Sequence, residues 1–430
     1  MTKSSKALRD ARGRPVVVVT GFDLVSSLGR GKENNWKRLV AGNSGIHRIE
    51  RFSTEGLKTT VAGTVDFMKL DAYSAPALSL AMARAVANEA IAESAIGLKG
   101  QFPGPLFLAT PPTELEWPQR RALFEAGRDS QRSGYDRLLA GARTRRFGAM
   151  FAEFQFASVG EHLANEFGTQ GLPISLSTAC ASGATAIQMG VEAIRRGETD
   201  AALCVATDGS VHAEALIRFS LLSALSTHND PPEAASRPFS KDRGGFVMAE
   251  GAGAFVLESY DRARARGAPI LGVIRGCGER ADDYHRTRTH PDGVPIIAAI
   301  RSALTDADCP PHTIDYVNAH GTGTPENDKM EYLALANVFG ERVHQLPVSS
   351  SKSMIGHTLT AAGAIEAGVS LMSISKGMLP PTINCESPDP EINLDIVPFT
   401  GRRANVRTVL SNSFGFGGQN ACLVLAGEPA

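Results

Sequence analysis

Short apolar runs alternate along the chain with longer alanine-rich or amphipathic segments, a pattern typical of an α/β protein. The first run, VVVVTG, follows Pro15 and is closed by Gly21, so we expect a buried strand there. Residues 77–96 favour a helix, because Pro76 stands at its start and Gly97 just past its end. Further strands are predicted at 105–110, 202–207 and 252–259.

A second round of elements begins near Ile270. Both rounds have the same order: a strand, a reactive loop, a helix and another strand. Its strands are predicted at 271–278, 314–320 and 347–351, and its helices at 296–307, 329–339 and 359–375. We therefore expect two similar halves, residues 15–265 and 266–430, with mixed sheets and buried helices in layers. No low-complexity linker separates the halves, so they are predicted to share one core, and residues 1–14 to form a flexible tail.

The segment 111–147 departs from this pattern and is predicted to be a variable helical insert on the surface. Its stretch 120–146 is rich in arginine, with acidic residues between the basic ones. Two explanations stay open: the arginines dock an acidic protein partner, or they belong to a solvated helix face.

Composition narrows the class of protein. The chain has 430 residues, of which 43% are apolar and 21% charged, as in ordinary globular proteins. A formal net charge of −1 gives no overall attraction to nucleic acid or an anionic membrane, so neither partner is expected. No apolar stretch reaches the roughly 20 residues of a membrane span, and none follows the basic N-terminus as a signal peptide requires. The six cysteines are scattered, which favours reduced thiols and a cytoplasmic location.

Cys180 is the first candidate for chemistry. In STACASG, residues 177–183, it follows an apolar strand and precedes a helix packed with small residues. A thiol at such a corner lies beside a helix N-terminus, whose free N–H groups favour the thiolate. The alternative is an inert buried cysteine, which is a common state of free thiols.

Two histidines strengthen the catalytic interpretation. His320 and His357 each lie in a loop rich in Gly, Ser and Thr that follows an apolar strand, where α/β proteins present functional groups. A zinc site with Cys180 is not favoured, because the sequence suggests neither a local ligand pair nor a fourth ligand. The remaining histidines are expected to be ordinary core or surface residues: His47, His162, His212, His228, His285, His290, His312 and His344.

A glycine-rich segment, SNSFGFGGQN at 411–420, completes the set. Its glycines allow positive φ and expose backbone N–H groups, as an oxyanion hole requires. The segment lacks the GxGxxG spacing of a dinucleotide loop, and a strand follows it directly.

These segments together are similar to the elongating β-ketoacyl-acyl carrier protein synthases, which have the thiolase fold. The similarity is dense from residue 177 onward and thin before it. The strings that carry it are VVVTG (17–21), STACASG (177–183), ALSTHNDPPEAASRPFSKDRGGFVMAEGAG (224–253), DYVNAHGTGTPENDKMEY (315–332), SSSKSMIGHTLTAAGAIE (349–366), PPTINCESPDPEINLDIVP (380–398) and SNSFGFGGQN (411–420).

The resemblance implies a role for each matching residue. Cys180 matches the nucleophile that accepts the acyl chain from phosphopantetheine. His320 and His357 match the pair that promotes malonyl decarboxylation and stabilises the enolate. Lys352 and Glu331 match residues that support the electrostatics of the site.

Further positions match residues that bind substrate. Thr322 and Thr324 match hydroxyls that hydrogen-bond pantetheine. Phe246 matches an aromatic side chain of the malonyl pocket, and Phe414 is a weaker candidate for the same wall. Asp328 is a weaker structural candidate.

The resemblance also implies the reaction, a decarboxylative Claisen condensation with malonyl-acyl carrier protein. Phe416 matches the aromatic residue that gates the acyl pocket, and its N–H, with that of Cys180, resembles an oxyanion hole. No metal or other resident cofactor is expected, because the substrates are carried on the phosphopantetheine of acyl carrier protein. A homodimer is the family expectation.

One departure leaves the acyl substrate open. The family usually has a Gly-rich turn after the strand at 105–110, whereas this chain has ATPPTELEWPQ. We therefore expect unusual or very long acyl chains.

Three other classes fit the residues less well. A thiolase needs a second catalytic cysteine near the C-terminus, but Cys422 lies within a predicted strand. A chalcone-type polyketide synthase needs a Cys–His–Asn set. A non-catalytic partner of the chain-length-factor type lacks the nucleophile that Cys180 provides.

Overall fold

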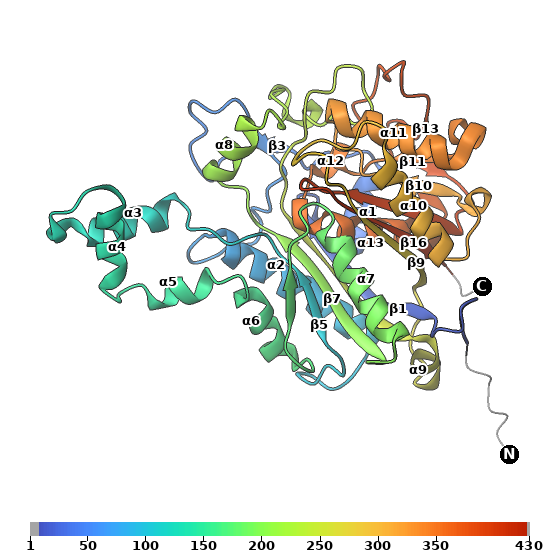
Figure 1. Ribbon diagram of the computed structural model, residues 1–430, viewed down its shortest axis with the longest axis horizontal. Coiled ribbons are helices and arrows are strands. Elements are labelled where there is room, and N and C mark those ends of the chain that lie inside the picture. Colours follow the sequence, from blue (N-terminus) through green and yellow to red (C-terminus); the bar gives the residue numbers. More distant parts are fainter. Residues whose placement is uncertain (1–7, 428–430) are drawn as a thin grey trace.

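The structure is a computed structural model that describes residues 8–427, and one mixed sheet runs through it (Figure 1). The sheet has twelve strands, and β2 (Gly29–Arg30) pairs with β1 beside the main path. From one edge to the other the strands are β13 (Asp395–Ile396), β11 (Pro347–Ser349), β10 (Tyr316–Asn318), β15 (Thr408–Phe414), β16 (Gln419–Ala426), β9 (Gly272–Ala281), β1 (Val17–Ser26), β8 (Gly251–Ser259), β7 (Ala201–Asp208), β5 (Leu106–Ala109) and β6 (Ile174–Leu176).

The two rounds of the sequence meet where β1 pairs with β9. This antiparallel contact joins Val18 to Val273 and Val19 to Gly272. The sequence predicted mixed sheets for two halves, and this contact makes them one continuous sheet. Two smaller sheets pair β3 (His47–Arg48) with β4 (Val61–Ala62), and β12 (Met378–Leu379) with β14 (Arg402–Arg403).

Two helices pack against each other at the centre of the molecule, α7 (Ser182–Arg195) and α13 (Ala362–Lys376). Glycines make their close approach possible. A Cβ on Gly183 would lie 2.5 Å from the backbone nitrogen of Ala364, and one on Gly363 would lie 2.5 Å from that of Ala184. Since Cys180 precedes α7 and His357 precedes α13, this crossing brings the two loops together.

The remaining helices of the body cover the sheet and its ends (Figure 1). In α2 the Ser74 hydroxyl accepts from the Ala77 N–H and Pro76 occupies the first turn, so the helix begins slightly before the predicted position. The helices that cover the sheet and its ends are α1 (Lys32–Val40), α2 (Ala75–Ser94), α6 (Ser158–Phe167), α8 (Ala213–Leu221), α9 (Tyr260–Ala265), α10 (Val294–Asp306), α11 (Pro325–Phe339) and α12 (Lys352–Ile355).

The segment predicted as a helical insert forms a helical arm that projects from the body (Figure 1). The arm comprises α3 (Trp117–Ala126), α4 (Gly134–Arg143) and α5 (Gly148–Glu153), so its helices extend just past residue 147. Trp117 and Phe151 are exposed on it.

The N-terminal segment is described from residue 8 onward, and residues 1–7 of the predicted tail lie outside the described part. Residues 8–14 contact the body through ion pairs. Arg9 pairs with Asp261 at 2.7 Å, and Arg14 pairs with Asp306 at 2.9 Å. No helix within residues 8–427 is both long enough and apolar enough to span a membrane.

Candidate active site

Cys180 lies at a sharp corner between β6 and α7, as the sequence predicts. Ala179 has φ of 48°, a left-handed conformation that costs a residue with a side chain about 1–2 kcal/mol. The Ser182 hydroxyl stabilises the corner, because it accepts from the Thr178 N–H at 2.8 Å and donates to the Ala179 carbonyl. The corner leaves Cys180 half-buried, whereas the other five cysteines are buried.

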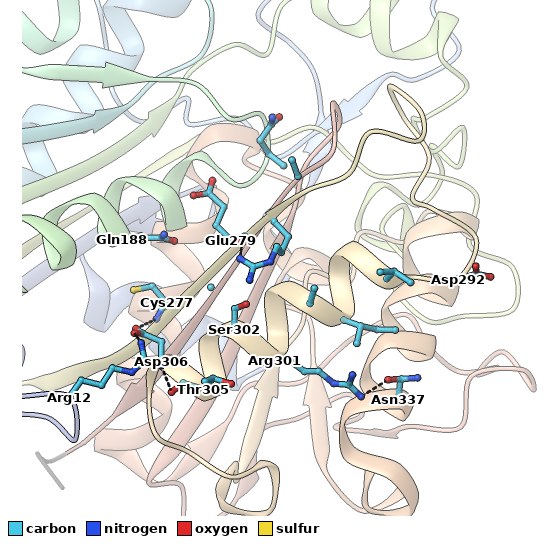
Figure 2. A pocket seen from close by; sticks show the side chains of 17 residues that line it. Arg12, Gln188, Cys277, Glu279, Asp292, Arg301, Ser302, Thr305, Asp306 and Asn337 are labelled. Atoms are coloured by element: carbon cyan, nitrogen blue, oxygen red, sulfur yellow. Dashed lines mark hydrogen bonds and ion pairs between the residues drawn. The ribbon is translucent and has the colours of Figure 1, made fainter.

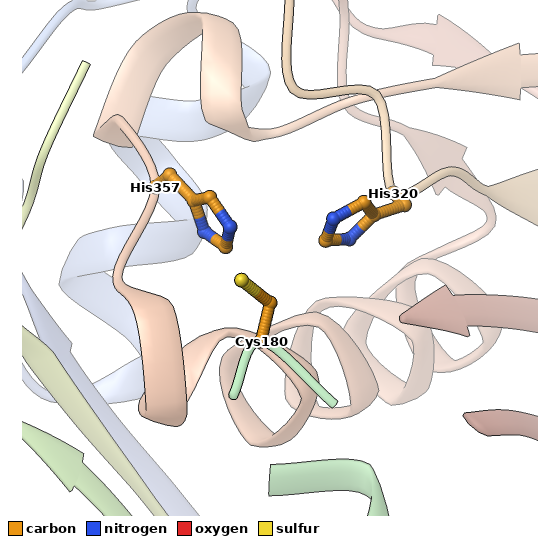
Figure 3. Close-up of side chains that lie close together, drawn as sticks. All are labelled: Cys180, His320 and His357. Atoms are coloured by element: carbon orange, nitrogen blue, oxygen red, sulfur yellow. The ribbon is translucent and has the colours of Figure 1, made fainter. Parts of the chain in front are cut away.

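The structure brings Cys180, His320 and His357 together (Figure 3). The sulfur and one nitrogen of each ring lie within 4.8 Å of one another. The two ring centroids are 5.3 Å apart and the rings are nearly perpendicular. His320 follows β10 and His357 lies between α12 and α13. The three side chains therefore converge because their loops lie at the ends of central strands and helices.

Buried carboxylates and an ammonium group hold the two histidine loops in place. The Glu331 carboxylate accepts from the N–H groups of His320 and Gly321 at 2.9 and 2.8 Å. Lys352 donates to the His320 carbonyl at 2.7 Å and forms a buried ion pair with Glu366. Burial raises the pKa of Glu366 to about 7, against the opposing charge of Lys352.

Glu366 was missed by sequence reasoning, although it is the only charged residue in a run of small and apolar positions, 359–375. Such an isolated charge needs a buried partner. Asp328, by contrast, does not reach the reactive group. Its carboxylate accepts from the N–H groups of Phe239 and Gly323 at 2.7 and 3.2 Å, and so holds the loop before α11.

Hydrogen bonds to both rings indicate which nitrogen carries the proton. The Leu359 N–H donates to His357 Nδ1 at 3.3 Å, and Lys352 Nζ lies 3.4 Å from His320 Nδ1. Donors facing Nδ1 place the proton of each neutral ring on Nε2. Among the described residues, His357 Nε2 has no partner and is free to donate.

This donor arrangement bears on the zinc alternative. Histidines that bind a metal usually donate their second ring N–H to an acceptor. Here the second nitrogens of His320 and His357 face donors instead. The site therefore suits an anionic oxygen better than a metal ion.

Burial and charge set the protonation states. Burial, assisted by Lys352, lowers the pKa of His320 and of His357 well below the usual value, so both rings are neutral near pH 7. Burial also raises the pKa of Cys180 to about 11, although the Phe416 N–H and Lys352 act in the opposite direction. The thiol form therefore predominates, in contrast to the thiolate that the helix end led us to expect.

Two cavities meet at Cys180. The first is a channel to the surface, which contains both histidines, Thr322 and Thr324. The Thr322 and Thr324 hydroxyls are 2.9 Å apart. Phenylalanine rings form part of its wall: Phe246 packs edge-on against His357, and Phe414 packs edge-on against His320. The rim includes Arg286 and Arg288, which sequence reasoning did not identify.

The second cavity has a volume of about 410 Å³ and extends from Cys180 toward the base of the helical arm. Cys180, Phe219, Leu359 and Phe416 line both cavities, so Phe416 stands at their junction. The Phe416 N–H opposes the rise in the pKa of Cys180. Its loop needs glycine, because a Cβ on Gly418 would lie 1.9 Å from the Asp282 carbonyl oxygen.

A larger depression of about 1230 Å³ lies elsewhere, between β9 and α10 (Figure 2). Its lining includes Arg12, Arg280, Arg301 and Asp306. None of the three converging residues belongs to it. Size alone therefore does not locate the reactive site.

Comparison with known proteins agrees with this geometry. The family model "Beta-ketoacyl synthase, N-terminal domain" matches residues 14–84 and 123–263, and "Beta-ketoacyl synthase, C-terminal domain" matches 271–386. The 3-oxoacyl-[acyl-carrier-protein] synthase 2 of Coxiella burnetii is 35% identical over 95% of this chain and 98% of its own. The tetracenomycin polyketide synthase ketoacyl synthase alpha subunit of Streptomyces glaucescens is 35% identical over 95% and 96%.

A solved structure gives the same result. It shows a type II polyketide ketosynthase, AntDE, with its acyl-carrier protein, AntF; the matching chain has a TM-score of 0.85 and 31% identity, over 96% of this chain and 100% of that one. The predicted thiolase-like α/β fold is confirmed by this likeness. The chain belongs to the β-ketoacyl synthase family, and it is a condensing enzyme of the acyltransferase type.

Proposed function

We propose that this enzyme is a β-ketoacyl-acyl carrier protein synthase that extends an acyl chain held on Cys180 with malonyl-acyl carrier protein. The observation that carries the proposal is the convergence of one sulfur and two imidazoles where two cavities meet. The names of the relatives support a carrier protein as partner.

The first half-reaction loads the acyl group. The Cys180 sulfur attacks the carrier thioester, the new carbon–sulfur bond forms, and the carrier thiol leaves with the proton of Cys180. The proton passes to the departing carrier sulfur, since both neighbouring rings hold their proton on Nε2 and act as donors rather than bases. The N–H groups of Cys180 and Phe416 stabilise the oxyanion of the intermediate.

The second half-reaction releases CO₂ from malonyl-carrier and leaves an enolate. Its oxygen accepts hydrogen bonds from Nε2–H of His320 and of His357, which are neutral donors because burial lowers their pKa. The enolate carbon attacks the Cys180 thioester, and the sulfur leaves as a thiolate that takes one proton from solvent. Lys352 and Glu331 are positioning residues, since they hold the loop and ring of His320.

Substrate binding follows from the same division of space. Thr322 and Thr324 hydrogen-bond the pantetheine arm in the channel, and Phe246 and Phe414 line the malonyl position. The second cavity, from Cys180 toward the base of the helical arm, is the acyl cavity. Phe416 gates it at the point where it meets the channel. No resident metal or other cofactor takes part in this scheme, and a second copy of the chain is the expected partner in a dimer.

The proposal also covers which acyl chain the enzyme extends and in which kind of pathway. Curated relatives include both 3-oxoacyl-carrier synthases and polyketide ketoacyl synthases. Since Pro111, Pro112 and Glu114 line the acyl cavity in place of a Gly-rich turn, we propose very long or specialised acyl chains rather than the common medium-length ones. Equal kcat/KM on common medium-chain acyl-carriers would count against this choice.

The test is a condensation assay with acyl-carrier and malonyl-carrier radiolabelled on its methylene carbon. The labelled β-ketoacyl-carrier should form together with one CO₂, and iodoacetamide should abolish the product. The Cys180→Ala variant should make no product while still releasing CO₂. Normal elongation by this variant would falsify the assignment, and absence of both activities in the native enzyme would favour a non-catalytic partner subunit.

A further inference from the structure

The helical arm contains a cavity of its own, which condensation at Cys180 does not use. Its volume is about 450 Å³, and its lining comes from α3, α4, α5 and the segments beside them. The two polar residues of the lining, Arg145 and Gln155, are exposed to solvent. The rest of the lining is apolar or small, and its large members are Leu115, Leu123, Phe147, Met150, Phe151 and Phe154. We call this space the arm cavity.

The arm cavity leaves apolar surface in contact with water. Phe151 is 70% exposed, and its neighbours Met150 and Phe154 are half-buried. Covering such a cluster with another apolar group removes this surface from water, which is favourable. A concave and mostly apolar lining is the usual form of a site for an apolar ligand. The arm cavity therefore suits a hydrocarbon chain.

The arm cavity and the acyl cavity lie on two sides of one wall. In the irregular segment before α3, Glu114 lines the acyl cavity and the next residue, Leu115, lines the arm cavity. Successive Cα atoms are about 3.8 Å apart, so the thickness of the chain separates the two linings at this point. A second link crosses the short connection between α5 and α6, where Phe154 lines the arm cavity and Val159 lines the acyl cavity. The two cavities therefore adjoin at the base of the arm.

The outer end of this wall is a weak contact. Arg218 of α8 binds both carboxylate oxygens of Glu114. The Arg218 side chain is 53% exposed and that of Glu114 is 26% exposed, so water screens the pair. Its loss costs little, and the end of a chain can pass beside it. Residues 85–122, which contain Glu114 and Leu115, fall outside the N-terminal family match, so the wall belongs to a part of the chain that the family model does not describe.

We propose that the arm cavity is a second binding site for the acyl chain, and that a very long chain passes the Glu114–Arg218 pair and lays its distal end against Phe151. The inference rests on the proposed function, because the near end of the chain is assumed to be held on Cys180. The acyl cavity provides about 410 Å³ and the arm cavity about 450 Å³, so the second site roughly doubles the space for hydrocarbon. The substrate class is then defined by length: chains that fill the acyl cavity and continue beyond it.

The test measures binding without turnover. Saturated acyl-pantetheine analogues of increasing length are titrated by calorimetry into the Cys180→Ala protein. Once the acyl cavity is filled, each added methylene should still tighten binding about threefold, because it moves from water into the arm cavity. A plateau in affinity at the length that fills the acyl cavity would overturn the proposal. Failure of the condensation assay would refute the proposed function and leave this series measurable.

Two variants in the same background locate the effect. Phe151→Gln replaces an apolar side chain of the arm cavity that is largely exposed, so the fold of the arm should be retained. It should weaken binding of the longest analogues about fivefold and leave the Kd of the shortest unchanged. Tyr135→Gln is the matched control, since Tyr135 is 72% exposed on α4 and is not part of the lining. The control should change neither Kd, and equal effects of the two variants would contradict the proposal.

A photoreactive diazirine at the end of the longest analogue gives the position of the chain directly. After irradiation, peptide mapping should find the label in the segments 115–123 and 147–154. Label on the body alone would overturn the proposal. So would a change of oligomeric state in Phe151→Gln without any change in the Kd of the long analogues, which would assign the arm cavity to a second copy of the chain.

Discussion

The two cavities that meet at Cys180 are built from different parts of the chain. The channel is formed mostly by loops of the C-terminal half, around His320, His357 and the loop 415–418. The acyl cavity is formed mostly by the N-terminal half, from the segment 110–114 and residues 208–222, and Leu359, Thr360 and Phe416 complete it. In the proposed reaction, this division would separate the chemical step from the choice of acyl chain, so that each could change without the other.

The cavities also differ in how their polar groups are satisfied. On the channel side, Glu331, Lys352 and Glu366 are buried and bind one another's loops. On the acyl side, the Glu114–Arg218 pair is partly exposed. A substitution in the channel should therefore affect every substrate strongly, whereas one in the acyl cavity should affect only some chains.

The largest effect is expected from removal of one enolate donor. His357→Ala should lower the rate of malonyl decarboxylation about a hundredfold to a thousandfold, because one preorganised hydrogen bond to the developing anion is lost. His320→Ala should have a comparable effect. Both should leave the affinity for acyl-pantetheine analogues nearly unchanged, since the histidines do not line the acyl cavity.

The measurement is release of CO₂ from carboxyl-labelled malonyl-carrier, alongside calorimetric binding of an acyl analogue. His162→Ala is the matched control, since this histidine is exposed on α6 and bonds only its own helix. A parallel loss of acyl binding in His357→Ala would show that the two cavities are not separable.

A second prediction concerns the thiol shared by both cavities. Since the pKa of Cys180 is raised to about 11, the thiolate fraction falls tenfold for each pH unit below that value. The rate of alkylation by iodoacetamide should therefore rise about a hundredfold from pH 7 to pH 9. Over the same range the histidines should stay neutral, because their pKa values are lowered.

Intact mass and peptide mapping would check that only Cys180 reacts, since the other cysteines are buried. A rate that levels off near pH 8 would show instead that the helix end and Lys352 outweigh burial. Lys352 and the helix end would then lower the pKa of Cys180 more than the structure indicates.

The sequence predicted the channel well because its residues follow the ends of central strands. His320 comes two residues after β10, and loops at the same edge of a parallel sheet converge. Strands and helices were likewise predicted at nearly the observed positions, since their apolar periods and Pro or Gly boundaries are local signals.

Contacts between distant segments could not be predicted in this way. The joining of β1 to β9 depends on two residue pairs with no local signature. His212 looked like an ordinary histidine, and only the path of α8 places it on the acyl cavity. The pKa of Cys180 depends on how much water burial removes, which the strand-to-helix pattern does not reveal.

The smallest effect is expected at the surface, where two basic regions compete as the docking site of the carrier. Arg286 and Arg288 are exposed at the rim of the channel, and neither forms an ion pair within the described part of the chain. The helical arm, which carries Arg145 and Arg146, projects from the body (Figure 1), and the segment 110–114 just before the arm lines the acyl cavity. Carrier proteins of this pathway are expected to be acidic, so the free charges at the rim should attract them.

Charge reversal of Arg286 and Arg288 to Glu should raise KM for malonyl-carrier about tenfold at low salt, with kcat nearly unchanged, and the difference should shrink as ionic strength rises. The same reversal of Arg145 and Arg146 in the arm is the matched control and should leave KM within about twofold, because exposed charges far from a partner are screened. The opposite ranking would place carrier docking on the helical arm. In that case the acyl side of the molecule would select the carrier as well as the chain.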